Sequence, residues 1–238
     1  MKYWIRASVV LLALGANLVA AEELFPNGRP RALPKFSELP SNTTVGGYPL
    51  YTGARNWYLM MHRADTVDLD VRIASASLVS PLDGDYFAEM TISASITGST
   101  EEGYYTGDLC SPGRSHLFML NKGAGRNDNC LLVDPVSAKI GAAELPLLSV
   151  KVRNSQSSLR LYDLTLYFNL NKFGFPGTTS ADWSAGAVAT DPQKKQTIDK
   201  IVAWAKQLQD GVNKAIAFSK PQDAFDAVPP IQTLLAVD

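Results

Sequence analysis

Residues 86–97 read Tyr-Phe-Ala-Glu-Met-Thr-Ile-Ser-Ala-Ser-Ile-Thr, and this stretch decides the fold class. Apolar or small residues alternate with mostly polar ones, as expected for a β-strand with one buried face. Residues 66–73 alternate in the same way, and residues 81–85 between the two stretches have the composition of a turn. We therefore predict a long β-hairpin. A change of phase between residues 74 and 78 indicates a β-bulge in its first strand.

A second hairpin is predicted from residues 147–152 and 159–170, which flank the polar segment 154–158. In its second strand, the apolar residues of one parity are Leu164, Leu166, Phe168 and Leu170. Short apolar runs at residues 117–120 and 131–133 predict further strands. The first two thirds of the chain therefore indicate an antiparallel β-structure.

The period of the apolar residues changes after residue 190. Asp191 is a candidate N-cap and Pro192 fits the first helical turn, so a helix should begin there. The apolar stripe at helical spacing consists of Ile198, Ile201, Val202, Ala205, Leu208, Val212 and Ile216. Gly211 lies inside this run and is a candidate for the end of the helix or for a bend. We predict an α+β fold: an antiparallel sheet or sandwich with one long C-terminal amphipathic helix packed on it.

Composition excludes several classes of protein. The chain has 238 residues, of which 46% are hydrophobic and 19% charged, so it is neither disordered nor a charged tail. Its 22 basic and 23 acidic residues give a net charge of -1, which offers no field for nucleic acid. Two histidines and two cysteines are too few for a zinc cluster. We therefore expect no metal and no cofactor.

The first 21 residues have the layout of a secretory signal peptide. Lys2 and Arg6 precede an apolar run at residues 7–14, and the small residues Val19-Ala20-Ala21 follow. We predict cleavage after Ala21 and a periplasmic or secreted protein. The alternative is an uncleaved anchor, but the apolar run is shorter than the roughly 20 residues that a spanning helix needs. No later run approaches that length, so no membrane span is expected after cleavage.

The mature chain is predicted to have three parts. Residues 22–53 form a Pro/Gly-rich arm, residues 54–218 a single α+β domain, and residues 219–238 a C-terminal tail with three prolines. The apolar residues available to dock the arm on the domain are Leu24, Phe25, Leu33, Phe36 and Leu39.

Cys110 and Cys130 are the only cysteines. In an oxidising compartment they should form a structural disulfide. The alternative, a redox-active pair, usually has two residues between the cysteines at a helix start, and this spacing differs.

Two segments are candidate recognition sites. The segment that contains Trp57, Tyr58, Met60 and Met61 is a candidate apolar pocket, because aromatic rings and methionines adapt to apolar ligands. Its alternative is ordinary core. Tyr104 and Tyr105 lie between glycines in a polar stretch, as in an exposed recognition loop. Their alternative is a turn that packs its own rings.

Signals for catalysis are weak, and we assign no catalytic residue. Pairs of carboxylates, which a hydrolase or a calcium site would need, occur at Asp68/Asp70, Asp83/Asp85 and Glu101/Glu102. A solvated polar face is the favoured explanation of these pairs. The glycine-rich segment 123–128 begins like a nucleotide loop, but an aspartate replaces its third glycine and no helix pattern follows. No Gly-x-Ser-x-Gly nucleophile motif occurs.

Several features stand together in the second half of the chain: the two cysteines with their neighbours His116-Leu117-Phe118 and Asn129, the Phe-Gly-Phe-Pro segment 173–176, and the helix with Trp204. In these features the chain resembles a loosely defined group of exported bacterial proteins of unknown function. The resemblance covers residues 100–210 and implies an exported, disulfide-bridged protein. It implies no catalytic residue.

Three functions follow as hypotheses. The first is a non-enzymatic binding or accessory protein of the cell envelope, with an unknown ligand or an envelope protein as partner. The second is a carboxylate-dependent cell-envelope hydrolase. The third is an envelope-assembly subunit that acts by adding a strand to a sheet edge.

Overall fold

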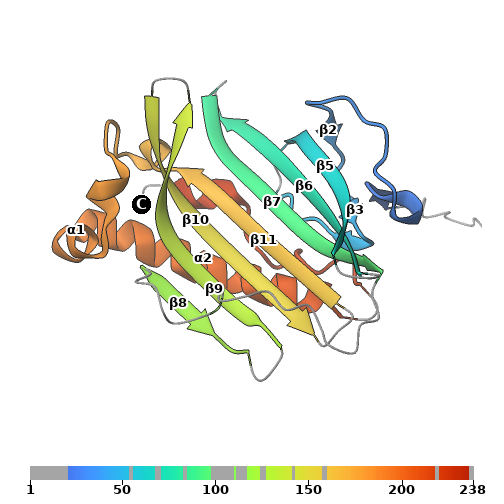
Figure 1. Cartoon of the computed structure of the whole chain (residues 1–238). Coiled ribbons are helices and arrows are strands. Elements are labelled where there is room, and N and C mark those ends of the chain that lie inside the picture. The colour runs from blue at the N-terminus through green and yellow to red at the C-terminus, as the bar shows by residue number, and fades with distance from the viewer. Residues whose placement is uncertain are drawn as a thin grey trace, which may run out of the picture.

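The computed structural model describes residues 21–53, 56–67, 71–82, 85–97, 110, 117–123, 127–140, 143–156, 160–217 and 220–235. Its main feature is an eight-stranded sheet, with α2 (Pro192–Ala215) behind it in Figure 1. The strands that follow one another in the sheet are antiparallel neighbours, ordered β2-β5-β6-β7-β11-β10-β9-β8. The predicted α+β fold is confirmed.

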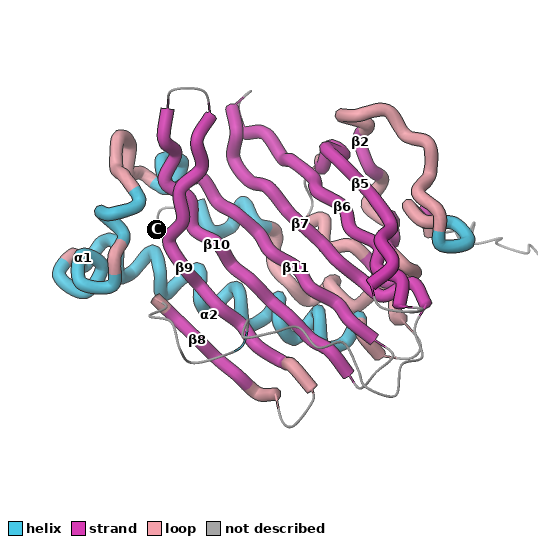
Figure 2. Tube along the Cα trace, viewed as in Figure 1, coloured by secondary structure: helices cyan, strands magenta, loops and turns pink. Residues whose placement is uncertain are grey.

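The large sheet consists of two meanders joined side by side (Figure 2). One contains β5 (Trp57–Val67), β6 (Val71–Leu82) and β7 (Asp85–Thr97), with the short β2 (Glu38–Leu39) at its edge. The other contains β8 (Phe118–Asn121), β9 (Asn129–Ile140), β10 (Ala143–Gln156) and β11 (Arg160–Asn169). Pairing of β7 with β11 unites them. Both predicted hairpins are present, as β6–β7 and β10–β11.

The prediction of one strand over residues 66–73 is wrong. Val67 pairs with Val71 across the ladder between β5 and β6, so the chain reverses inside this stretch. Within β6, Ala74, Ala76 and Leu78 are all buried on the same parity, and no register shift separates them. Ile73 has the opposite parity and is half-buried, so the apparent change of phase arises because β6 carries apolar residues on both faces. Register shifts occur elsewhere, between Leu59 and Met61 in the ladder of β5 and β6, and at Arg72/Ile73 and Ser80/Pro81 in the ladder of β6 and β7.

One face of the large sheet is packed on α2. Residues of alternate parity in β7, β11 and β10 supply Met90, Ile92, Leu164, Leu166, Val150 and Val152 to the core, all at most 1% exposed. The helix contacts β9 and β10, its apolar stripe belongs to the same core cluster, and every residue predicted for that stripe is buried. Asp191 caps the helix by accepting hydrogen bonds from the N–H groups of Gln193 and Lys194, as predicted. The helix continues through Gly211.

The two ends of the described chain complete this core. A three-stranded sheet is formed by β1 (Glu22–Glu23), β3 (Thr43–Val45) and β4 (Tyr48–Pro49). Among the predicted docking residues of the arm, Leu24, Phe25 and Leu39 are buried, Leu33 is half-buried and Phe36 is exposed. In the C-terminal segment, Ala224, Val228 and Ile231 are buried, and the indole N–H of Trp204 donates to the carbonyl of Pro229.

Short helices connect the remaining parts. They are η1 (Pro26–Gly28), η4 (Leu170–Phe173), η5 (Ser180–Trp183), α1 (Ala185–Thr190) and η6 (Ile231–Leu235). Within the described ranges, no helix is both long and apolar enough to cross a membrane.

Candidate functional site

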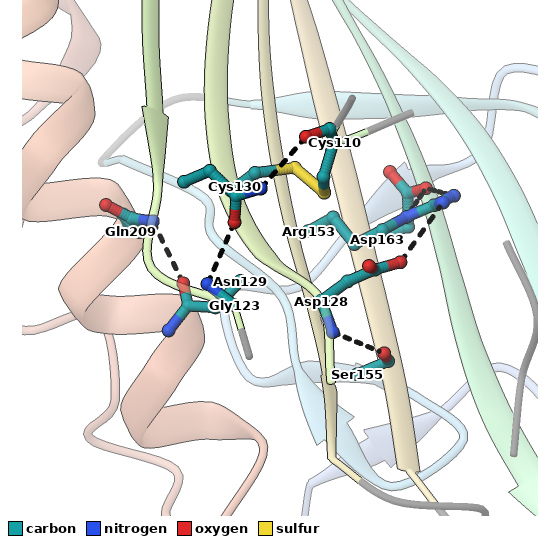
Figure 3. Close-up of a disulfide and its surroundings, with 10 residues drawn as sticks. Cys110, Gly123, Asp128, Asn129, Cys130, Arg153, Ser155, Asp163 and Gln209 are labelled. Carbon is teal, nitrogen blue, oxygen red and sulfur yellow. Dashed lines mark hydrogen bonds and ion pairs between the residues drawn. A yellow bond between two sulfur atoms is a disulfide. The ribbon is translucent and has the colours of Figure 1, made fainter. Parts of the chain in front are cut away.

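A polar depression lies where the turn between β8 and β9 meets the end of β10 (Figure 3). Its volume is about 420 Å³. It is lined by Lys122, Gly123, Asn127, Asp128, Asn129, Asn154, Ser155 and Gln156. Every lining side chain carries a hydrogen-bonding group, so the depression suits a polar ligand.

Local backbone contacts shape the turn. The N–H of Gly123 donates to Oδ1 of Asn121 at 2.8 Å, and the N–H of Lys122 donates to the carbonyl of Asn129 at 2.7 Å. A Cβ at Gly123 would lie 2.4 Å from the carbonyl oxygen of Asn127, so only glycine fits here. This turn joins two antiparallel strands rather than a strand and a helix, which is not the setting of a nucleotide loop.

Amide groups from α2 hold the floor of the depression in place. Nε2 of Gln209 donates to Oδ1 of Asn129 at 2.9 Å, and Nδ2 of Asn154 donates to Oδ1 of Asn213 at 2.6 Å. Gln209 and Asn213 are four residues apart on α2 and therefore lie on the same side of the helix. Gln209 is fully buried, and its Oε1 has no hydrogen-bond partner among the described residues. The floor is therefore held by two amide pairs, each with one buried member, Gln209 and Asn154.

A buried ion cluster stands beside the depression, on the opposite face of β10 from Asn154. The side chain of Arg153 is 8% exposed, and its Nε lies 2.9 Å from Oδ2 of Asp163. A second carboxylate oxygen, Oδ2 of Asp128, lies 4.0 Å from Nη1 of Arg153. Main-chain and side-chain hydrogen bonds between Asp128 and Ser155 fix this edge of the turn. The arginine is thus neutralised inside the protein and is not presented to a ligand.

The disulfide between Cys110 and Cys130 is present, as predicted, with a Cα–Cα distance of 5.7 Å. Cys130 pairs with Arg153 in the ladder of β9 and β10, so the disulfide lies on the same face as the ion cluster. Nδ2 of Asn121 donates to the carbonyl of Cys110 at 2.9 Å. Both cysteines are buried, and they pack with Leu132 and Met119. The disulfide therefore links residue 110 to the start of β9, whose first residue, Asn129, lines the depression.

A second hollow of about 380 Å³ separates the arm from the C-terminal segment. Its lining includes Thr43, Leu50, Tyr51, Phe225 and Val228. The hydroxyl of Tyr51 donates to the carbonyl of Pro229, and burial raises the pKa of this hydroxyl above its usual value. Tyr51 is therefore neutral at physiological pH and acts here as a structural contact.

The four residues of the predicted apolar pocket are placed differently from one another. Trp57 is fully buried in the core and donates to the carbonyl of Thr52. Tyr58 and Met60 are half-buried, whereas Met61 is 56% exposed. None of the four lines either hollow described above.

Other candidate residues fall outside the described ranges. These are Tyr104, Tyr105, His116, Asp68, Asp70, Asp83, Glu101 and Glu102, and the side chain of Asp85. The chain's other histidine, His62, is described, and its Nε2 hydrogen-bonds the carbonyl of Arg31. Within the residues that were placed, no group of histidine, cysteine and acidic side chains could hold a metal ion.

Sequence reasoning missed the amides that build the depression. Asn129 was noted only as a neighbour of Cys130, and Asn154 only as part of a turn. Gln209 lies between Leu208 and the polar residue Asp210, where a glutamine is normally solvent-exposed. A polar residue on the edge of an apolar helical stripe was the available signal.

No protein family model matches this chain, and no characterised protein or solved structure is significantly similar to it. The arguments that follow therefore rest on the chain's own geometry.

Proposed function

We propose that this protein is an exported, non-enzymatic binding protein, periplasmic or secreted, whose ligand occupies the amide-lined depression. The observation that supports this most directly is the buried floor. Asn154 is almost fully buried and Gln209 is completely buried. The side-chain amides of both form hydrogen bonds that hold the depression in shape. Such pre-organised polar groups lower the entropy lost on binding.

The lining chemistry favours a neutral, hydroxyl-rich ligand of the carbohydrate class. Amide side chains both donate and accept hydrogen bonds, as sugar hydroxyls do. The charged residues of the lining are one lysine, Lys122, and one aspartate, Asp128. Arg153 lies between Asp163 and Asp128, so this cluster carries one net negative charge, which Lys122 balances; the described lining therefore offers no surplus of either charge to an ionic ligand. Among the described lining residues, an apolar ligand finds no aromatic or aliphatic side chain.

Export is supported by two independent features. Residues 1–21 have the layout of a signal peptide, and the disulfide is the kind that persists in an oxidising compartment. The first strand of the structure begins at Glu22, directly after the predicted cleavage site. N-terminal sequencing of the exported protein should therefore find Glu22. A Met1 terminus on exported protein would contradict cleavage.

Ligand binding is tested by titration calorimetry of the mature protein with neutral oligosaccharides of the glucan, chitin and mannan types. We expect saturable binding to at least one of them. Gln156→Ala removes a half-buried amide from the rim, and losing about 1 kcal/mol of hydrogen bonding should raise the Kd about fivefold.

The matched control is Gln222→Ala, which removes an exposed amide from the second hollow. It should leave the Kd unchanged. The proposal is refuted if no oligosaccharide binds saturably, or if binding responds to Gln222 and not to Gln156.

A further inference from the structure

The outer edge of β5 is covered over only part of its length (Figure 2). Strand β2 pairs with Trp57 and Tyr58, and the preceding residues Phe36 and Ser37 exchange backbone hydrogen bonds with Leu59. From residue 61 to residue 67, no described residue makes a backbone hydrogen bond to this edge. Within the described part of the chain, the second half of this eleven-residue strand therefore has N–H and C=O groups on its outer edge without a backbone partner.

The ladder shows which residues offer these groups. The N–H and C=O of Leu59 point toward the edge, because both bond to the segment beside β2. The bulge between Leu59 and Met61 shifts the alternation by one residue. Beyond it, His62, Ala64 and Thr66 direct their backbone groups outward. Arg63 and Asp65 lie on the opposite parity, and their side chains form an ion pair at 2.8 Å while remaining largely exposed.

We propose that this edge pairs with the same edge of a second copy of the chain. The two β5 strands run antiparallel about a twofold axis at Ala64, and one continuous sheet crosses both molecules. Arg63 of each copy then lies opposite Asp65 of the other, and Ala64 lies opposite itself. Met61 lies opposite the last residue of the other strand.

Charge selects this register over its neighbours. Centring the pair on residue 63 would place two arginines directly opposite each other, and centring it on residue 65 would do the same with two aspartates. Like charges directly opposite destabilise an antiparallel pair, whereas opposite charges stabilise it. A twofold axis also requires self-complementarity, which the sequence Arg-Ala-Asp at 63–65 has. The small side chain at its centre lets the two backbones approach.

Exposed apolar side chains mark the same edge. Phe36 is 57% exposed and Met61 is 56% exposed, and they are the large apolar side chains that the described part of the chain leaves in solvent. Both border Leu59, where the covered half of the edge ends. Beyond Leu59, the contacts between the described arm and β5 involve the side chain of His62, which hydrogen-bonds the carbonyl of Arg31 and packs against Phe25, and not the backbone of β5. Pairing of two copies would shield both apolar residues.

Sedimentation velocity of the mature protein over a wide concentration range tests the proposal. We expect a reversible monomer–dimer equilibrium. Asp65→Arg places like charges opposite each other at two symmetric positions and should raise the dimer dissociation constant about tenfold or more. Arg63→Asp should do the same. The double variant Arg63→Asp/Asp65→Arg restores opposite charges and should recover the wild-type constant.

Two controls keep the result specific. Lys195 and Asp199 form an exposed ion pair on α2, and exchanging their charges should leave the dimer unchanged. Thermal melts at low concentration verify that each variant is folded. A wild-type protein that stays monomeric at every concentration overturns the proposal, because the charges then serve only to prevent edge aggregation. The proposal is also overturned if Asp65→Arg leaves the dimer dissociation constant unchanged, or if the double variant does not recover the wild-type constant.

Discussion

Replacing Gly211 by alanine tests how the C-terminal segment packs against α2. Gly211 is buried in the interior of the helix, and its backbone does not have a positive φ, so the backbone conformation does not require glycine at this position. Alanine is about 1 kcal/mol more favourable than glycine in a helix interior, so helix propensity alone predicts a more stable protein. The surroundings predict the opposite. A Cβ at this position would lie 2.6 Å from Cδ1 of Phe225 and 3.2 Å from Cγ2 of Val228.

Sterics should outweigh propensity here. Carbon atoms in contact normally lie about 3.5–4.0 Å apart, so the ring of Phe225 would have to move by about 1 Å. The rings of Tyr51 and Tyr162 restrict that movement, with centroids 5.8 and 6.2 Å from the ring of Phe225. Overpacking of this kind costs about 1–3 kcal/mol. We therefore expect Gly211→Ala to lose about 1 kcal/mol net, or about 2–4 °C in Tm for a chain of this size.

A double-mutant cycle with Phe225→Ala isolates the contact. Once the ring is removed, Gly211→Ala should stabilise the protein by about 0.5–1 kcal/mol, because only the propensity gain remains. The measurement is urea unfolding followed by circular dichroism, with all four proteins compared at equal concentration. If Gly211→Ala raises the stability of the otherwise wild-type chain, residues 224–228 do not pack on α2 as described and the reasoning fails.

Three further predictions concern stability. Leu208→Ala should lower the free energy of unfolding, measured in urea, by about 2–5 kcal/mol because it leaves a cavity under α2. The neighbouring Gln207 is exposed, and Gln207→Ala should change this free energy by no more than about 0.5 kcal/mol. Equal effects would mean that the buried face of the helix is wrongly assigned. Asp163→Asn should cost about 3–5 kcal/mol because it removes a partner from a buried arginine, and the matched control Asp199→Asn, on an exposed pair, should cost almost nothing. Burial raises the pKa of the Tyr51 hydroxyl, so this group ionises in the unfolded chain before it does in the folded one, and Tm should fall as the pH rises above about 10. Tyr51→Phe should make this fall of Tm with pH less steep. An unchanged dependence of Tm on pH would contradict the burial of the hydroxyl.

Local patterns were sufficient to predict the two hairpins and the long helix of this fold, but not β5 or the short strands of the arm. Alternation in residues 86–97 and helical spacing from Ile198 to Ile216 both arise because one side of each element is buried. The helix start at Asp191 depends on capping within three residues, and it was predicted correctly. The disulfide followed from there being two cysteines and an export signal. Each of these features is determined by neighbours in sequence or by composition.

The tertiary structure alone decided how these elements are combined. Val67 and Val71 belong to different strands and pair with each other, although the alternation runs through them unchanged, because directly paired residues of neighbouring strands lie on the same face of a sheet. The amide floor joins Asn129 to Gln209 across 80 residues of sequence, and no local pattern encodes that contact. The arm and the C-terminal segment read as irregular because their apolar residues lack a period, yet Leu24 and Ile231 are fully buried. Local burial periodicity can be read along the chain, whereas pairing and packing depend on which distant surfaces meet.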